Sequence, residues 1–187
     1  MHINFQFCAW TLPPFLTEQP GRLPGQDFLI DEYMVYEARV YGADTVLLIV
    51  AVLEEPLLRS LIACSRSLGM EPLVEVNNDA ETKMALSCGA RIIGVNNRNL
   101  HNFSVDASTT EVIMQDNAKA LEEADCMLCA LSGIQCRTDV QRYTVMGVEM
   151  VIAHCTLSAP IYRLGGRDGN STLHPVCSHI PSWGSRW

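Results

Sequence analysis

The sequence predicts an α/β fold in which helices alternate with the strands of one parallel sheet. Some segments carry apolar residues at helical spacing, and several of them stop at a glycine. Between them stand short apolar runs, such as residues 45–50, that are typical of strands covered on both faces. Helices that regularly follow strands indicate parallel pairing, because a parallel strand must be reached by a crossover connection.

Each element is expected from its periodicity and from its ends. Helices are expected where apolar residues recur every three or four positions, and strands where a few apolar residues stand together. In chain order these criteria give helix 31–41 ending at Gly42, strand 45–50, helix 55–68 ending at Gly69, strand 72–76, helix 79–87 ending at Gly89, strand 91–95, helices 106–116 and 118–123, strand 126–130, helix 138–146 ending at Gly147 and strand 149–153.

Two arrangements of such a sheet fit the spacing of the strands. The expected strands begin roughly 20–35 residues apart, and a (β/α)8 barrel of about 250 residues has a mean period of about 31. An open, doubly wound sheet has a similar period and stays an alternative. The sequence contains neither a G-x-G-x-x-G nor a G-x-x-x-x-G-K-[ST] loop, which disfavours an open nucleotide-binding sheet.

The two ends of the chain differ from this regular middle part. Residues 1–26 are rich in proline and nearly uncharged, and residues 154–187 contain Pro, Gly, Ser and His without periodicity. We therefore expect three segments: an atypical N-terminal segment (1–26), a regular α/β part (27–153) and an atypical, disordered tail (154–187).

Composition disfavours several classes of protein. A chain of 187 residues with 48% apolar residues suits one globular domain. Its formal net charge of −8 disfavours a nucleic-acid partner, because phosphate backbones are bound by basic surfaces. No apolar run is long enough for a membrane-spanning helix, and the N-terminus does not resemble a signal peptide. We therefore expect a cytoplasmic protein without a membrane partner.

The eight cysteines are expected to be reduced and structural. Cys126 and Cys129 form a C-x-x-C pair, a spacing that redox and zinc sites also use. Met127 and Leu128 fill the gap inside an apolar run, so buried thiols are favoured. No metal site is expected.

Polar residues stand at the ends of three consecutive expected strands. In a parallel barrel these ends meet on one face, where active sites lie, so we expect one site there. The residues are Glu75 and Asn77 at the second strand, Asn96 and Arg98 at the third, and Ser132 with Gly133 at the fourth.

Each of these residues also has a simpler interpretation. Glu75 could begin a solvated loop, although its flanking valines favour a buried carboxylate with its pKa raised toward general-base range. Asn96 and Asn97 could be ordinary turn residues. Arg98 could form a surface ion pair or bind an anion in a bidentate manner. The Ser-Gly pair could be a plain turn, or could offer backbone N–H groups at a helix start to a phosphate.

Longer stretches of the sequence resemble a known enzyme family. Four segments carry this resemblance and occur in order between about residues 27 and 151. They are DFLIDEYMVYEARVYGADTVLLIV, SRSLGMEPLVEVNN, GARIIGVNNRNLHNFSVD and ALSGI. They resemble indole-3-glycerol phosphate synthase, most closely its domain in fungal multifunctional tryptophan-biosynthesis proteins, where ALSGI replaces the bacterial AESGI.

This resemblance implies a fold and an activity. The family is a (β/α)8 (TIM) barrel that converts carboxyphenylamino-deoxyribulose phosphate, a phosphorylated small molecule, to indole-3-glycerol phosphate. It does so by ring closure, decarboxylation and dehydration, and is therefore a carboxy-lyase of tryptophan biosynthesis. The resemblance implies no metal or organic cofactor, and it allows other tryptophan-pathway domains in a parent protein.

The resemblance also implies roles for individual residues. Glu75 matches the glutamate at the end of the family's fifth strand, a general acid/base candidate for the dehydration. Asn96 matches the asparagine that holds the substrate and orients the proton transfer. Substrate binding is implied for Leu48 on the apolar fourth strand of the family, Asn77 beside the glutamate, Arg98 and Leu100 of the N-x-R-x-L word, and Ser132 with Gly133 near the phosphate site.

The sequence departs from the family pattern at both ends. The family's general acid for ring closure is the lysine of an L-R-K-D-F word, and Gln26 stands in its place. The first-strand word that contains a glutamate and a lysine is absent, and His154 and Cys155 stand where the last strand of the family has a glycine near the phosphate. We therefore expect an incomplete barrel that has about strands four to eight and lacks the N-terminal strands.

Two functional hypotheses follow from these residues. In the first, the chain is the synthase with impaired activity, because losing one general acid lowers the rate by about 10²–10⁴-fold. Alternatively, it is a catalytically dead remnant or a partner-dependent fragment of that enzyme. A different phosphate-binding barrel, such as phosphoribosylanthranilate isomerase, fits less well because its motifs differ from those around Glu75 and Asn96.

Overall fold

The computed structural model describes residues 28–98, 105–106, 108–134, 137–152, 161–163 and 174–175. Apart from helices 106–116 and 118–123, which form one helix, the predicted helices and strands are present within two residues of their expected bounds, and a single turn of 3₁₀ helix (Val50–Val52) follows the first strand. In chain order the elements are α1 (Glu32–Val40), β1 (Leu47–Ile49), α2 (Glu55–Ser67), β2 (Leu73–Val76), α3 (Asp79–Ser87), β3 (Ile92–Asn96), α4 (Ser108–Glu123), β4 (Met127–Leu131), α5 (Arg137–Val145), β5 (Met150–Ile152), β6 (Ile161–Arg163) and β7 (His174–Pro175).

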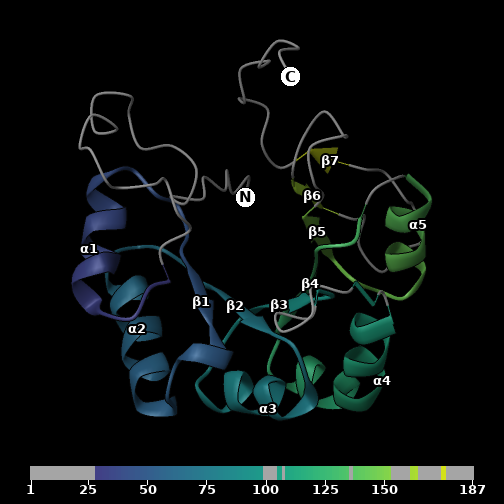
Figure 1. Ribbon diagram of the computed structural model, residues 1–187, viewed down its shortest axis with the longest axis horizontal. Coiled ribbons are helices and arrows are strands. Elements are labelled where there is room, and N and C mark those ends of the chain that lie inside the picture. Colours follow the sequence, from purple (N-terminus) through teal and green to yellow (C-terminus); the bar gives the residue numbers. More distant parts are fainter. Residues whose placement is uncertain are drawn as a thin grey trace.

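The strands form one sheet in which each strand pairs with the next along the chain. The pairs from β1 to β5 are all parallel, as the alternation of helices and strands predicts. The sheet curves, and helices α1 to α5 lie along its outer side (Figure 1). The architecture is therefore an α/β fold with the curved parallel sheet of a partial barrel.

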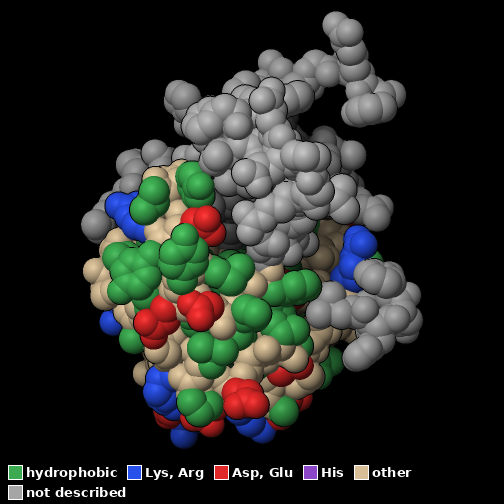
Figure 2. All heavy atoms as spheres, turned by 60° about the vertical axis from the view of Figure 1, so that its left-hand side comes forward, with side chains coloured by type: hydrophobic (Ala, Val, Ile, Leu, Met, Phe, Trp, Pro, Cys, Tyr) green, Lys and Arg blue, Asp and Glu red, His purple; other side chains and the backbone are tan. Residues whose placement is uncertain are grey.

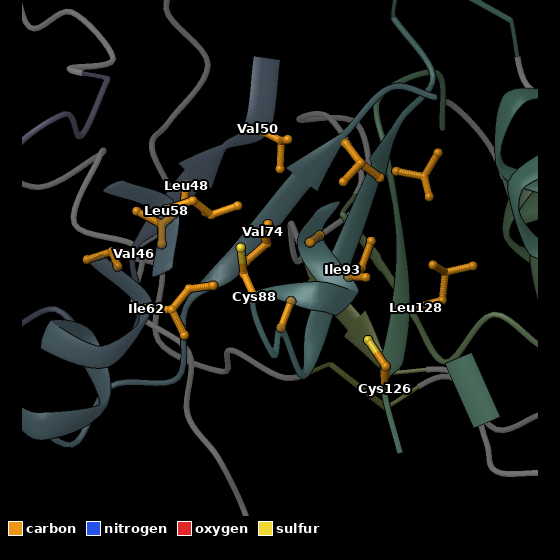
Figure 3. Packing of buried hydrophobic residues seen from close by; sticks show 14 of the residues in the cluster. Val46, Leu48, Val50, Leu58, Ile62, Val74, Cys88, Ile93, Cys126 and Leu128 are labelled. Carbon is orange, nitrogen blue, oxygen red and sulfur yellow. The ribbon is translucent and has the colours of Figure 1, made fainter. Parts of the chain in front are cut away.

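Side chains of the strands form two layers, because successive residues of a strand point to opposite faces. The larger layer joins Leu48 and Val74 of the sheet to Leu58 and Ile62 of α2 in one buried cluster (Figure 3). The smaller layer lies on the opposite, inner face and consists of Leu73, Ile92, Cys129, Leu131 and Met150. Because Leu73 is an inner residue, Glu75 two positions later belongs to the inner face as well.

Helix α4 corrects one sequence prediction. It runs unbroken from Ser108 to Glu123, whereas two helices separated at Asn117 were expected. The Asn117 side chain is buried and donates to the carbonyl oxygen of Ile113 at 3.1 Å and to Asp79 Oδ1 at 3.0 Å. Since both amide hydrogens find acceptors, this asparagine has no need to interrupt the helix.

Two short strands lie within residues 154–187, the segment that the sequence predicts as a tail without structure. Strands β6 and β7 lie in it and pair antiparallel, β6 with β5 and β7 with β6. Both are very short, with three and two residues, so their sequences carry no period that could reveal them.

The cysteines of the C-x-x-C pair are buried and free. Cys126 belongs to the cluster beneath the helices and Cys129 to the inner cluster. Burial raises the pKa of the Cys126 thiol to about 12 and raises that of Cys129 too. Two thiols on opposite faces of a sheet cannot share a metal ion or form a disulfide without rearrangement, so the structural interpretation of this pair is confirmed.

An ion cluster stabilises the N-terminal ends of β2 and β3. The guanidinium group of Arg66 donates to the carboxylate of Glu71, with Nε at 3.1 Å from both oxygens, and Arg91 lies 3.6 Å from the same carboxylate. Arg66 also donates to the Gly89 carbonyl oxygen at 2.8 Å. This cluster joins α2 to the N-terminal ends of two strands.

Within the described part of the chain, no helix is long and apolar enough to cross a membrane.

Candidate active site

The buried carboxylate of Glu75 is the centre of the site. Glu75 lies in β2, opposite Ile49 of β1 and Gly94 of β3, and its side chain is only 7% exposed. Gly94 leaves space on the inner face that Leu131 and Leu73 fill, because a Cβ atom there would meet a Leu131 methyl carbon at 2.7 Å. Apolar side chains therefore lie around this position, and the carboxylate is largely removed from water.

The Asn96 side chain holds the Glu75 carboxylate in one orientation. Its Nδ2 donates to Glu75 Oε1 at 2.9 Å from the C-terminal end of β3. Its Oδ1 accepts from the backbone N–H of Arg98 at 3.0 Å, which fixes the amide with its donor side toward Glu75. The sequence predicts that these two residues lie on the same face at the C-terminal ends of the strands, and the structure brings them into direct contact.

Burial raises the pKa of Glu75 above its ordinary value of 4.5. The hydrogen bond from Asn96 favours the ionised form and opposes this shift, and the negative charge of Glu81 adds to it. Among the described residues no cation pairs with this carboxylate. Glu75 therefore has the environment of a carboxyl group that can carry a proton and give it up near a substrate.

Asn77 and Arg98 lie at the rim of the same site. The Asn77 Nδ2 atom donates to the Arg98 carbonyl oxygen in a long contact of 3.4 Å, which links the segments after β2 and β3. Arg98 is exposed, and no carboxylate forms an ion pair with it among the described residues. Of the two interpretations of Arg98, a surface ion pair thus lacks a partner there, and anion binding stays open.

Ser132 and Gly133 form a strained turn directly after β4. Both have positive φ angles, 62° and 74°. A Cβ atom at Gly133 would lie 2.5 Å from Cγ1 of Val105, so glycine is required by space as well as by conformation. Helix α5 begins later, at Arg137, and this turn is therefore not the first turn of a helix. Any phosphate contact here would have to come from the turn itself.

Asn97 has a structural role that the sequence prediction missed. Its Nδ2 donates to the Leu131 carbonyl oxygen and to the Tyr143 hydroxyl, both at 3.0 Å. Its Oδ1 accepts from the hydroxyl of Thr110 at 2.8 Å and from the Thr110 backbone N–H at 3.2 Å. Asn97 thus joins β3 to β4, α4 and α5 and is no ordinary turn residue. The available signal was its parity, since it follows Asn96 and must point to the other face.

Leu48 is the predicted site residue that the structure places elsewhere. It is fully buried in the cluster beneath the helices, and its partner across the sheet is Val74. The residues of β1 that share a face with Glu75 are Leu47 and Ile49. Leu48 therefore does not line the mouth, because the strand alternates faces and the prediction is off by one position.

The remaining predicted positions lie outside the described residues. These are the substrate-binding candidate Leu100 and the departures from the family pattern at Gln26, His154 and Cys155. Within the described ranges no group of three His, Cys, Asp or Glu side chains is arranged to hold a metal ion.

Solved structures with a similar arrangement confirm the fold. The chain is similar to a mandelate oxidase mutant, with a TM-score of 0.50 and 16% identity, over 66% of this chain and 45% of that one. It is also similar to a flavocytochrome b2 mutant, with a TM-score of 0.53 and 12% identity, over 64% and 38% of the two chains. At such identities the likeness concerns the barrel fold alone.

Comparisons of sequence are more specific. The family model described as "Indole-3-glycerol phosphate synthase" matches residues 13–157. The multifunctional tryptophan biosynthesis protein of Phanerodontia chrysosporium is 57% identical over 127 residues, which are 68% of this chain and 16% of that protein. The indole-3-glycerol phosphate synthase of Dehalococcoides mccartyi is 43% identical over 136 residues, which are 73% of this chain and 51% of that protein. The chain thus spans about half the length of the Dehalococcoides mccartyi relative.

Proposed function

The chain belongs to the indole-3-glycerol phosphate synthase family, and we propose that it acts in that reaction of tryptophan biosynthesis. The reaction converts carboxyphenylamino-deoxyribulose phosphate to indole-3-glycerol phosphate by ring closure, decarboxylation and dehydration. The observation that carries this proposal is the buried Glu75–Asn96 pair at the C-terminal ends of two neighbouring strands. In parallel barrels, catalytic groups lie at this end of the strands.

We assign Glu75 to the dehydration step as general acid and base. Burial favours its protonated form, so the carboxyl group can give a proton to the departing hydroxyl, which leaves as water. The resulting carboxylate can then accept the proton that the ring must lose. Asn96 keeps one oxygen of the carboxyl group engaged, so that the other oxygen is available for the transfer.

Substrate contacts are proposed for the rim. Arg98 is an exposed cation beside the pair and suits an anionic group of the substrate. Asn77 after β2 and the Ser132–Gly133 turn after β4 lie at the strand ends on either side of β3 and offer amide and backbone donors. Leu100 is proposed for the same set on its family motif alone.

The part of the reaction that precedes dehydration is proposed to be impaired in this chain. Ring closure in the family uses a lysine as general acid, and an amide such as that of Gln26 cannot supply this proton. We further propose that the reaction takes place in the cytoplasm, with other domains of the tryptophan pathway as partners in a parent protein, as the names of the fungal relatives suggest.

One surface favours the second candidate, a partner-dependent fragment. Large hydrophobic side chains are exposed on and around α1, near the edge of the sheet that β1 forms (Figure 2). They include Tyr33, 70% exposed, and Val40, 82% exposed. Exposed apolar patches of this kind are typical of surfaces that another chain or domain covers.

A turnover assay with carboxyphenylamino-deoxyribulose phosphate tests these candidates. It is run on the whole chain alone and after addition of the separately expressed N-terminal half of the Dehalococcoides mccartyi relative. Turnover by the chain alone that disappears in Glu75→Gln supports the enzyme. Turnover only with the added half supports the partner-dependent fragment. No turnover in either mixture contradicts both and leaves a catalytically dead remnant.

A further inference from the structure

A ring of hydrogen bonds links the C-terminal ends of β2 and β3. It runs from Glu75 Oε1 to the Asn96 amide at 2.9 Å, and from Asn96 Oδ1 to the Arg98 N–H at 3.0 Å. It continues from the Arg98 carbonyl oxygen to Asn77 Nδ2 at 3.4 Å. The Asn77 backbone N–H in turn donates to Glu81 Oε2 at 2.7 Å. Because Asn77 follows Glu75 by two residues, the backbone of β2 closes the ring.

Glu81 lies outside this ring and binds it at Asn77, a contact that its place at the start of α3 does not require. Asn78 is the N-cap residue of α3, and its Oδ1 accepts from the Glu81 N–H at 3.0 Å. In the usual capping box, the glutamate at this position reaches back to the N–H of the cap residue itself. Here Glu81 Oε1 accepts from the side-chain Nδ2 of Asn78 at 2.7 Å, and Glu81 Oε2 accepts from the backbone N–H of Asn77. The helix cap is complete without this last contact.

The hydrogen bond from the Asn77 N–H to Glu81 fixes Asn77, which supports the Asn96 side of the Glu75–Asn96 pair. Asn77 stands directly after β2, and its side chain bonds the backbone of Arg98, whose N–H orients the Asn96 amide. Glu81 is also the charged group that acts on Glu75 among the described residues. The neighbouring strands present Ile49, Gly94 and the Asn96 amide to the carboxylate, none of which is charged.

We propose that Glu81 is a positioning residue for the Glu75–Asn96 pair, acting through the backbone of Asn77 and the segment that carries Arg98. This inference rests on the proposed function of Glu75 as acid and base. It adds that the helix after β2 is built into the site, because the first turn of α3 determines where the two strand ends lie relative to each other.

Nuclear magnetic resonance on the whole chain tests this without requiring turnover. The readouts are hydrogen exchange of the Asn96 side-chain amide and the ¹³C titration of the Glu75 carboxyl group, assigned with Glu75→Gln. In Glu81→Ala we expect the Asn96 amide to exchange at least about tenfold faster, because the acceptor that holds Asn77 is lost. Glu81→Gln keeps one oxygen that can accept from the Asn77 N–H and loses the contact with the Asn78 side-chain amide, so most of the protection is expected to stay. The titration midpoint of Glu75 moves to lower pH in this variant because the neighbouring charge is removed.

Two control variants separate positioning from helix stability. Asn78→Ala removes the N-cap acceptor of α3 and the side-chain amide that donates to Glu81 Oε1, but it leaves the contact of Glu81 Oε2 with the Asn77 N–H. It is therefore expected to lower stability and to move both readouts less than Glu81→Ala does. Glu55→Gln changes an exposed first-turn glutamate of α2, which pairs with Arg59, and is expected to move neither. The proposal is overturned if Glu81→Ala leaves the Asn96 amide protected, or if Asn78→Ala exposes it to the same extent. Since both readouts are made without substrate, a failure of the proposed reaction would be seen separately, in the turnover assay.

Discussion

Two glutamates four positions apart, one just before β2 and one near its C-terminal end, have very different surroundings. At the N-terminal end, Glu71 is partly exposed and lies within an ion cluster with Arg66 and Arg91. At the C-terminal end, Glu75 is 7% exposed and has the neutral amide of Asn96 as its hydrogen-bond partner. One carboxylate is thus compensated by opposite charge, while the other is buried without a cation among the described residues.

This difference fits a structural role for the glutamate at one end and the proposed chemical role for the glutamate at the other. A carboxylate bound by two arginines ties elements together, and an exposed pair of this kind contributes about 0–1 kcal/mol. A buried carboxyl group without a cation costs stability in its ionised form, and proteins retain such a group where its proton is used. The two ends of β2 differ by this criterion.

The largest expected effect is that of Glu75→Gln on turnover. In whichever form of the chain turns over carboxyphenylamino-deoxyribulose phosphate, we expect the rate to fall by about 10²–10⁴-fold, because an amide cannot transfer the proton. Glu71→Gln is the matched control at the other end of the strand and is expected to change the rate by less than about twofold. Equal losses in the two variants would contradict the division between the ends.

Asn97→Ala is expected to cost stability rather than chemistry. It removes the side-chain hydrogen bonds to β4, α4 and α5, and it leaves the Tyr143 hydroxyl without this donor and the buried Thr110 hydroxyl without its acceptor. We expect the free energy of unfolding to fall by about 2–3 kcal/mol in urea titrations followed by far-UV circular dichroism. Tyr143→Phe removes only one of these bonds and should cost about 1 kcal/mol. A loss below that value in Asn97→Ala would mean that Asn97 is only a turn residue.

A smaller effect is the dependence of stability on pH. Because burial raises the pKa of Glu75, the folded state binds this proton more tightly than the unfolded state does. Its contribution is therefore fully present below the ordinary value of 4.5 and is lost as pH rises through the raised pKa of the folded state. Glu75→Gln lacks this loss, so its stability relative to the unmodified chain should increase across that window and then level off. Urea unfolding of both chains from about pH 4 to pH 8 measures the difference, and a constant difference would count against a buried carboxyl group.

The smallest effect is expected from Glu71→Gln on stability. Removing the charge weakens the contacts with Arg66 and Arg91, which are partly exposed to water. We expect the free energy of unfolding to fall by about 0.5–1 kcal/mol, and the loss should shrink in high salt. A loss of several kcal/mol would show that this end of the sheet is as desolvated as the other.

The sequence predicted the order of the elements well because their signals are local. Periodicity and helix ends determine α3 to the residue, and the polar positions after consecutive strands predicted that Glu75 and Asn96 lie together. Tertiary information decided the rest. Leu48 was placed on the wrong face because a strand reverses its faces at each residue, so an error of one position changes the side.

The other differences have the same origin in contacts between distant segments. Asn97 and Asn117 resemble turn and breaker residues in sequence, yet each finds buried partners on other elements that no local pattern reveals. The same holds for the short strand β6, whose three residues gain their conformation from pairing with β5.

The ¹³C titration of the Glu75 carboxyl group in the whole chain tests the central claim most directly. The claim is that the C-terminal ends of β2 and β3 hold a desolvated carboxyl group ready to carry a proton. We predict a titration midpoint above 4.5 that is set mainly by burial. A midpoint at or below that value would mean that water or a cation reaches Glu75, and it would remove the basis for its role as acid and base.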